Sequence, residues 1–309
     1  MRPMRYRHRI SQRTCTARVG FRGRGGRHGP LPSRFPAPPW YYGMELPQDQ
    51  DLQFLRPPRY DKWGRNHGFE TRDECAGRDE ANREVLWIGD ERCQELGDRL
   101  ATCGRRHPCG SPACKRCMRE FRRAFTGIAL PPARQLVALG MMAVFVTIVW
   151  DDPALRNPSL RGLDLDRVKQ RLRMTLRRIG LGQVPMIGGI DFDWSEEWRV
   201  WEPHAHAVAF IYDESDLDPL YGSFRPSNDV PRPVVVQEVR ELHAALAYCW
   251  KFSPRRKTGR RQAGNGLRRK RGLKVARLRE ALLWLDVRDP MGFIFLQGIR
   301  RVGQSLYLR

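Results

Sequence analysis

Acidic residues are absent from two long segments of this 309-residue sequence. Residues 1–44 contain ten arginines and no aspartate or glutamate, and residues 253–279 contain twelve lysines or arginines, again without an acidic residue. Together the two segments account for the formal net charge of +22, so the rest of the chain is nearly neutral. Segments of this kind bind polyanions by releasing condensed counterions, and nucleic acid is the predicted partner. Neither segment has the apolar face of an interfacial helix, which argues against a membrane surface.

Long apolar runs are also missing. The longest, residues 136–150, is shorter than the roughly 20 residues that a helix needs to cross a bilayer, and it ends in Asp151-Asp152-Pro153. It predicts a buried β-strand instead. Neither a secretory signal nor a membrane span is evident, so we expect a cytoplasmic protein. In that compartment, the eight cysteines predict metal binding rather than disulfides.

The N-terminal segment, residues 1–44, is rich in Arg, Gly and Pro and cannot bury enough apolar surface to fold, so we expect a disordered basic arm. An Arg-rich N-terminus without acidic residues is also typical of organelle transit peptides. Its glycines and prolines argue against the amphipathic helix that such peptides require. Met44 is an alternative start of the protein, in which case the preceding residues are an over-extended reading frame.

Four cysteines cluster in the N-terminal region of residues 45–134, with the spacing Cys103-x5-Cys109-x4-Cys114-x2-Cys117. The Cys-x-x-Cys end supplies a tight turn with two thiolates, and four thiolates close a tetrahedral structural zinc site. We therefore predict a small Zn²⁺-binding module over about residues 93–123.

The ligand set of this module has alternatives. His107 could take the place of Cys103, and Cys93 is a more distant candidate ligand. Cys15, Cys75 and Cys249 stand alone and receive no role.

Two histidines interrupt the apolar run Pro203–Ile211. In a β-strand, alternate side chains point to the same side, so His204 and His206 would share one face and form half of a divalent metal site. The alternative is a half-buried strand whose histidines bind no metal.

The preceding apolar segment, Ile187–Trp194, predicts a second strand with Asp191 and Asp193 on one face. If the two strands pair through the turn at residues 195–202, a carboxylate can complete the ligand set. The other acidic candidates near the turn are Glu196, Glu197 and Glu202.

The segment Val236–Phe252 predicts an amphipathic helix. Tyr248 does not belong to its apolar stripe and lies nearly opposite, on a face with Glu241, Ala244 and Lys251. A tyrosine in that position is available for contacts outside the core. The stripe itself comprises Val239, Leu242, Leu246 and Cys249.

These motifs resemble those of the HUH endonucleases, most closely the rolling-circle replication initiators of bacterial plasmids and single-stranded phages. The apolar strand Phe145–Trp150 with Thr147 matches the first motif of that family. The histidine strand matches the second, and Tyr248 with Lys251 matches the third. The resemblance covers roughly residues 100–300 and includes a cysteine cluster ahead of the first motif.

The resemblance implies an α+β fold: an antiparallel sheet with an HUH-type catalytic site and packed helices, preceded by the zinc module and the basic arm. The catalytic domain would occupy residues 135–252, and residues 253–309 would form a basic segment with a helix and strand tail. The implied location is the bacterial cytoplasm.

The implied activity is nicking of single-stranded origin DNA. Mg²⁺ or Mn²⁺ would be held by His204, His206 and an acidic ligand, for which Asp191 matches best and Asp193 is the next candidate. Tyr248 would attack the phosphate, leaving a 5′-phosphotyrosine and a 3′-hydroxyl for a host polymerase, with a host helicase as a further candidate partner.

Other residues receive supporting roles. Lys251 would stabilise the phenolate or orient the phosphate. Some relatives carry a glutamate four residues before the tyrosine, where this chain has Ala244, and Glu241 is the available substitute. The expected DNA-binding residues of the basic segment are Arg255, Arg256, Lys257, Arg260, Arg261, Arg268, Arg269, Lys270 and Arg271.

Two rival functions fit the same residues. A transposase or mobilisation relaxase would use the same chemistry. A non-catalytic zinc-containing protein would coat nucleic acid with its basic segments and never become attached to it.

The remaining segments have plainer patterns. Asp164–Ile179 predicts a helix with acidic residues in its first turn, and Val275–Leu285 predicts another. Residues 213–233 predict an irregular connection, and Phe293–Leu296 predicts a short strand.

Overall fold

The computed structural model describes residues 69–104, 107–227, 230–251, 254–258, 269–303 and 305–308. The predicted basic arm and three of the predicted DNA-binding residues, Arg260, Arg261 and Arg268, lie outside the described residues.

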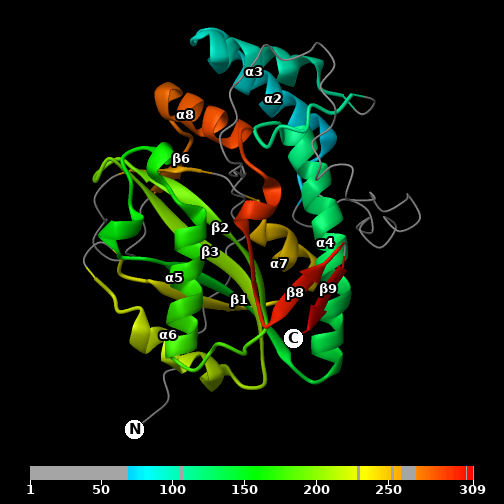
Figure 1. Cartoon of the computed structure of the whole chain (residues 1–309), viewed down its shortest axis with the longest axis vertical. Helices are drawn as coiled ribbons and strands as arrows, with labels where there is room; N and C mark the ends of the chain where they lie inside the picture. Colours follow the sequence, from blue (N-terminus) through cyan, green and yellow to red (C-terminus); the bar gives the residue numbers. More distant parts are fainter. Residues whose placement is uncertain are drawn as a thin grey trace.

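A seven-stranded sheet forms the centre of the fold (Figure 1). Its order is β4-β1-β3-β2-β5-β6, and β7 also pairs with β2. All pairings are antiparallel except that between β2 and β5. The prediction of an α+β protein with an antiparallel sheet is confirmed. The strands of this sheet are β1 (Met142–Val149), β2 (Met186–Ser195), β3 (Val200–Ile211), β4 (Val234–Glu238), β5 (Arg256–Thr258), β6 (Arg269–Arg271) and β7 (Ile294–Gln297).

One face of the sheet is apolar. Phe192 of β2 lies edge-on to Trp201 of β3, with ring centroids 5.6 Å apart, and to Trp284 of α8 (Val275–Asp286), at 5.0 Å. Helix α5 (Leu165–Arg178) also packs against β2. It confirms the helix predicted over Asp164–Ile179: its N-cap is Asp164, whose carboxylate accepts two backbone N–H groups, and its leucines are buried.

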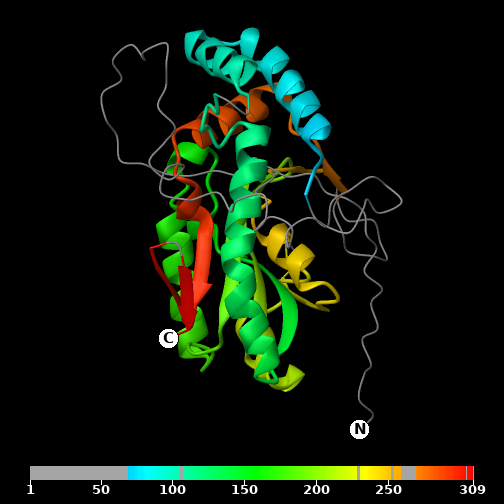
Figure 2. The same ribbon diagram turned by 90° about the vertical axis from the view of Figure 1, so that its right-hand side faces the viewer.

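Two helices lie on the other face. Figure 2 shows α4 (Lys115–Ala138) along the sheet, with α5 and α7 (Leu242–Cys249) on opposite sides. Helix α7 contacts β2, β3 and α4. The two faces thus separate the apolar core beneath α5 and α8 from the side that carries the polar strand residues.

The prediction of one helix over Val236–Phe252 was wrong in its bounds. The first residues belong to β4, and the helix begins only at Leu242. The β-branched run Val234–Val236 pairs with β1, so sheet hydrogen bonds replace the first helical turns.

Three helices close one end of the molecule, at the top of Figure 1: α2 (Arg72–Trp87), α3 (Glu91–Thr102) and α8. Helix α2 begins with a capping box between Thr71 and Glu74. Asp286 at the end of α8 forms an ion pair with Arg99 of α3. The predicted helix Val275–Leu285 is confirmed as α8, which is one residue longer.

Other segments differ from their sequence predictions. The apolar run 136–150 is not one strand, because α4 continues to Ala138 and β1 starts at Met142. The stretch 213–233 contains the short helix α6 (Asp218–Ser223) rather than only irregular structure. After β7, which includes most of the predicted strand Phe293–Leu296, a hairpin of β8 (Ile299–Val302) and β9 (Ser305–Leu308) packs against α4 through β9.

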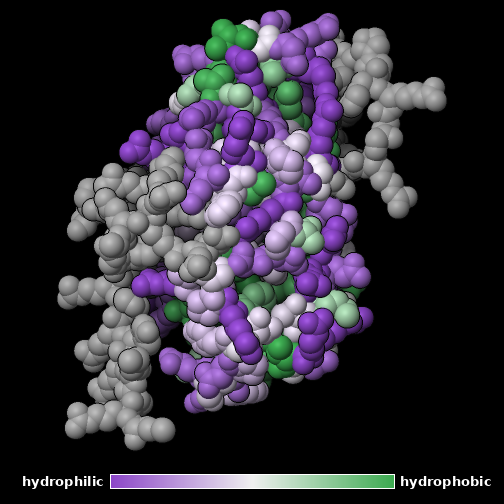
Figure 3. All heavy atoms as spheres, turned by 90° about the vertical axis from the view of Figure 1, so that its left-hand side faces the viewer, coloured by the Kyte–Doolittle hydropathy of each residue, from purple (hydrophilic) through white to green (hydrophobic). Residues whose placement is uncertain are grey.

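None of the helices in the described part of the chain combines the length and the apolar composition of a bilayer span. On the face drawn in Figure 3, the described surface is mostly hydrophilic, and hydrophobic side chains gather only in small groups.

Gly188 permits the close approach of β2 and β3. A Cβ atom at this position would lie 2.6 Å from Cβ of Ala207 and closer still to the carbonyl oxygen of His206. Both neighbours are fixed by the sheet, so neither can move without disturbing the strand that carries the histidines.

We therefore expect Gly188→Ala to lower the free energy of unfolding by about 1–3 kcal/mol. The control is Gly77→Ala in α2, where a Cβ meets nothing within 4 Å. That change should stabilise the protein by up to about 1 kcal/mol, because alanine is the better helix former. Urea unfolding of both variants measures the difference, and equal effects would contradict the close packing at Gly188.

Candidate functional site

Three buried side chains meet on the face beneath α7: Asp191, His204 and His206. Each offers a ligand atom, and these atoms all lie within 4.8 Å of one another. The pairing of β2 with β3 accounts for this, because Asp191 lies opposite His204 and Gly189 lies opposite His206. Nε2 of His204 is 4.0 Å from Oδ2 of Asp191. Two imidazoles and a carboxylate form a donor set that suits a divalent transition metal.

Strand β1 orients one of these histidines. Thr147 lies opposite His206, and its hydroxyl oxygen is 2.9 Å from Nδ1 of the ring. With Nδ1 bonded to Thr147, a metal would be bound through Nε2. A hydrogen bond of this kind fixes the orientation of a ligand imidazole. Thr147 of the first predicted motif therefore contacts His206 of the second.

Tyr248 of α7 lies over the histidines. Its ring centroid is 5.2 Å from that of His206 and 5.3 Å from that of Phe145, in edge-to-face contacts. The side chain remains 37% exposed. The ammonium of Lys251 is 3.5 Å from the centroid of the tyrosine ring, a cation–π contact. The phenol of Tyr248, the ammonium of Lys251 and a group of side chains that could hold a metal ion therefore lie next to one another.

Asp193, the second candidate ligand, belongs to a different cluster. Its Oδ1 accepts the backbone N–H of Arg255 at 3.0 Å, and Nζ of Lys257 is 3.9 Å from its Oδ2. The same ammonium donates to Glu202 at 2.9 Å. Glu202 thus binds Lys257, and it lies opposite Asp193, two residue pairs along the strands from Asp191 and His204.

The acidic residues of the turn are also placed away from the histidines. Glu196 binds Lys274 at 3.0 Å and lies 3.6 Å from Arg256, and Glu197 is exposed. Among the described acidic residues, Asp191 is therefore the one that joins the two histidines.

Glu241 was predicted to lie two helical turns before Tyr248 on the same helix face, and this prediction was wrong. It is the N-cap of α7, and its carbonyl accepts the first helical hydrogen bond, from Ala245. The difference follows from the shorter helix, which leaves Glu241 at its exposed beginning.

A buried arginine of α4 holds the helix of the tyrosine. Arg122 donates to the carbonyl of Ala247 at 3.2 Å and to the carboxylate of Glu70 at 2.6 Å. Arg78 binds the same carboxylate at 2.9 Å. Burial raises the pKa of Glu70, but the charges of Arg122, Lys115 and Arg78 outweigh burial and lower the pKa from 4.5 to about 2.

This ion pair should make stability depend on pH. Because the pKa of Glu70 is lower in the folded state, its contribution is present above pH 4.5 and is lost as pH falls toward 2. This contribution to the free energy of unfolding is on the order of 3 kcal/mol. We expect the free energy of unfolding to fall less between pH 4.5 and 2 in Glu70→Gln than in the unsubstituted protein. Glu95→Gln, at an exposed position on α3, is the control and should leave the slope unchanged.

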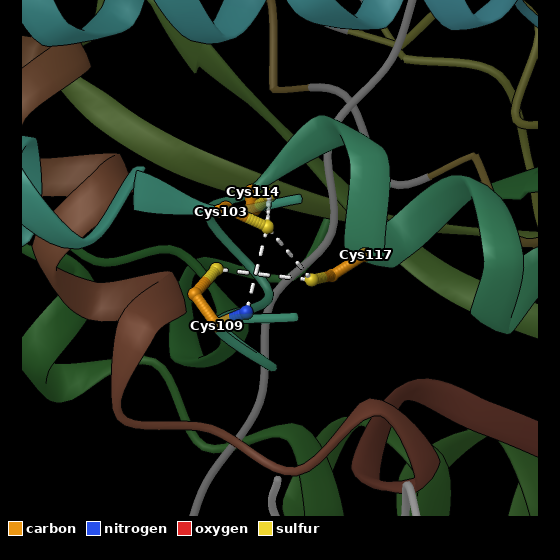
Figure 4. Close-up of side chains that lie close together, drawn as sticks. All are labelled: Cys103, Cys109, Cys114 and Cys117. Atoms are coloured by element: carbon orange, nitrogen blue, oxygen red, sulfur yellow. Dashed lines mark hydrogen bonds between the residues drawn. The ribbon is translucent and has the colours of Figure 1, made fainter. Parts of the chain in front are cut away.

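The four predicted zinc ligands converge at the start of α4 (Figure 4). Cys103 lies 3.4 Å from Cys114 and 3.5 Å from Cys117, and Cys109 lies 3.7 Å from Cys117, measured between sulfurs. The edges of a ZnS₄ tetrahedron with Zn–S bonds of about 2.3 Å are about 3.8 Å long. The spacing of the sulfurs therefore suits a tetrahedral metal site. His107 and Cys93 are not among the grouped ligands.

The surroundings act on the thiols of this cluster in opposite directions. Backbone N–H groups of Cys109 and Gly110 donate to the sulfurs of Cys103 and Cys117. Hydrogen bonds from Cys109, Cys114 and Cys117 lower the pKa of Cys103, whereas burial raises that of Cys114. Four thiols in contact, three of them buried, cannot all ionise unaided, but a divalent cation would hold all four as thiolates.

Asp79 is a supporting residue that the sequence analysis missed. It is completely buried, and its carboxylate accepts the N–H groups of Lys115 and Arg116 at the start of α4. The thiol of Cys114 lies 3.5 Å from it. The sequence does contain a signal for Asp79, because two polar residues, Asp79 and Asn82, occur at helical spacing among apolar ones. The buried face of α2 comprises Cys75, Asp79, Asn82 and Leu86.

We expect Cys114→Ser and Cys117→Ser to lower metal content and stability together, because the metal-binding free energy is part of the folding free energy. The matched control is Cys93→Ser, a buried cysteine outside the group, which should retain the metal. Elemental analysis after chelator-free purification measures the content, and about one zinc per chain is expected for the unsubstituted protein. Purified protein without zinc would contradict the assignment.

The basic segment adds two strands to the edge of the sheet. Arg256 and Lys257 belong to β5, which pairs with the end of β2, and β6 contains the run Arg269–Arg271. Arg255 lies directly before β5. Of the predicted DNA-binding residues that are described, those of β5 adjoin the strand that carries Asp191, and those of β6 lie one strand further out.

Comparisons of the chain with protein-family models, with curated proteins and with solved structures found no match. The arrangement of the side chains is therefore the basis for any assignment of function.

Proposed function

We propose that this protein is a metal-dependent endonuclease that nicks single-stranded DNA by attack of Tyr248, as an HUH-type rolling-circle replication initiator does. The observation that carries the proposal is the contact between the ring of Tyr248 and that of His206, a member of a buried two-histidine, one-aspartate group. The contact brings the nucleophile and the expected metal ligands together, although they are far apart in the sequence.

Asp191, His204 and His206 would hold the metal, which when bound would neutralise charge that develops on the scissile phosphate. Imidazole ligands suit Mn²⁺ better than Mg²⁺, whose preferred ligands are oxygens. The burial of all three side chains limits competition by water for the ligand atoms.

Tyr248 would supply the nucleophile. Its phenolic oxygen forms a bond to phosphorus while the bond from phosphorus to the 3′ oxygen breaks. The phenol proton is lost to solvent, and the departing 3′ oxygen gains a proton. The 5′ side of the DNA stays attached to the tyrosine, and a 3′-hydroxyl is left for extension. The ammonium of Lys251 over the ring favours the negative charge on the phenolate oxygen.

The Cys103–Cys117 cluster would hold a structural Zn²⁺ with four thiolates and no open position, so its role is stability rather than chemistry. Arg122, five residues after Cys117 on the same helix, binds the carbonyl just before Tyr248. This contact positions the nucleophile.

Two alternatives make different predictions. A transposase or mobilisation relaxase would form the same adduct on a different DNA sequence. A non-catalytic zinc-containing nucleic-acid-binding protein would form no adduct. The exposure of Tyr248 beside the buried histidines favours the enzyme, because a side chain that is 37% exposed there can be reached by a substrate.

We expect a covalent protein–DNA adduct when the protein is incubated with Mn²⁺ and single-stranded DNA from the replicon that encodes it. Tyr248→Phe should eliminate the adduct, and His204→Ala or His206→Ala should lower its rate by at least about a hundredfold. Denaturing gels detect the adduct, and mass spectrometry should locate the nucleotide on the peptide containing Tyr248.

Tyr221→Phe provides the matched control, because Tyr221 is also exposed but lies on α6. This variant should form the adduct at the rate of the unsubstituted protein. An adduct in Tyr248→Phe would show that another residue is the nucleophile. No adduct on any DNA of the replicon would favour the non-catalytic alternative.

A further inference from the structure

An exposed tryptophan stands at the tip of the hairpin between β2 and β3. Trp198 is 44% exposed, and among the described tryptophans only Trp87 is comparably exposed, at 43%. The two differ in their surroundings. Trp87 lies beneath the guanidinium of Arg83 and donates its indole N–H to Asp98. Trp198 is therefore the exposed tryptophan in need of an explanation.

The hairpin presents Trp198 from a fixed backbone. Its backbone N–H donates to the hydroxyl of Ser195 at 3.3 Å, and the N–H of Glu196 donates to the carbonyl of Lys257 at 3.2 Å. The next residue, Arg199, has a positive φ of 52°, which non-glycine residues adopt at a conformational cost. An ordered turn that tolerates this cost holds a large aromatic side chain at the surface.

The adjacent ribbon of β5 and β6 is strongly basic. Five of its six residues are Lys or Arg, in the sequences Arg-Lys-Thr and Arg-Lys-Arg. Arg256 lies opposite Arg271, and Lys257 lies opposite Lys270. Like charges in directly opposed positions destabilise a strand pair. A bound polyanion would remove this repulsion.

The carboxylates nearby compensate only part of this charge. Glu202 and Asp193 neutralise Lys257, and Glu196 is shared between Lys274 and Arg256. Arg271 is exposed at the edge of the sheet. Glu197, exposed on the hairpin beside Trp198, is a negative charge that would oppose an anion.

The hairpin is close to the candidate active site. Asp191 and Ser195 lie on the same strand, about 13 Å apart at about 3.3 Å per residue. A strand of nucleic acid that contacts Trp198 can thus continue toward Tyr248. Nucleic-acid sites without sequence preference combine these same two elements, an aromatic side chain for bases and a row of cations for phosphates.

We propose that Trp198 and the β5–β6 ribbon form a docking surface for single-stranded nucleic acid, with a base stacked on the indole and phosphates held by Arg256 and Arg271. The proposal rests on the proposed function for the role of the bound strand as substrate. Binding itself requires neither the metal site nor Tyr248.

The test measures binding of a fluorescein-labelled oligothymidylate to the full chain by fluorescence anisotropy, at several salt concentrations, in a chelator-free buffer without added Mg²⁺ or Mn²⁺. Trp198→Ala should weaken binding about tenfold and leave the salt dependence unchanged, because stacking carries no charge. Arg271→Gln should lower the slope of log affinity against log salt by about 0.7. Glu197→Gln should strengthen binding.

The matched controls are Trp87→Ala and Arg178→Gln, an exposed arginine on α5. Both should bind like the unsubstituted protein. Thermal unfolding of each variant verifies its fold. The proposal is overturned if folded Trp198→Ala binds with unchanged affinity, or if Trp87→Ala loses as much affinity for the oligonucleotide as Trp198→Ala. Selective capture of an acidic polypeptide instead of the oligonucleotide would likewise overturn it.

The adduct assay separates this inference from the proposed function. Trp198-dependent binding without any adduct supports the docking surface and contradicts the nicking enzyme. Adduct formation by the unsubstituted protein, with unaffected binding in Trp198→Ala, supports the nicking enzyme and contradicts the docking surface.

Discussion

The register between β2 and β3 is the constraint on which the candidate active site depends. Asp191 meets the histidines only because it pairs with His204, and Thr147 reaches His206 only through the matching register of β1. A shift of one residue would turn every side chain of a strand to the opposite face. The apolar partners on the other face, including Phe192 and Trp201, oppose such a shift because their burial would be lost.

A second constraint runs along α4. The helix starts at the cysteine cluster, where Cys114 is its N-cap, and two turns later Arg122 binds the backbone of α7. Glu70 holds the arginine in place from a third segment. The cysteine cluster and the tyrosine therefore belong to one packed unit. Buried ion pairs of this kind are costly to break, because one charge is then left unpaired.

Sequence patterns predicted the histidine strand, its acidic neighbour, helix α5 and the cysteine cluster, because each depends on local spacing. They failed where the structure depends on contacts between segments that are far apart in the sequence. Asp191 and Asp193 are equivalent in a strand pattern, and the difference arises from Lys257 and Arg255, which engage Asp193 from another strand. Likewise, the helical spacing of Val239, Leu242 and Leu246 extends across a boundary that only the pairing of β4 with β1 reveals. Nothing in the local pattern marks Arg122 as a partner of α7, or Glu70 as a partner of Arg122.

The engagement of Lys257 with Asp193 and Glu202 has an electrostatic consequence for the histidine group. Nζ of Lys257 lies near both carboxylates, and Arg156 lies 3.9 Å from Glu202. Asp193 and Glu202 thus have cations of their own, whereas Asp191 faces His204. A cation bound at the histidines would therefore meet the negative charge of Asp191, and the two neighbouring carboxylates would not be left as unpaired buried charges beside it.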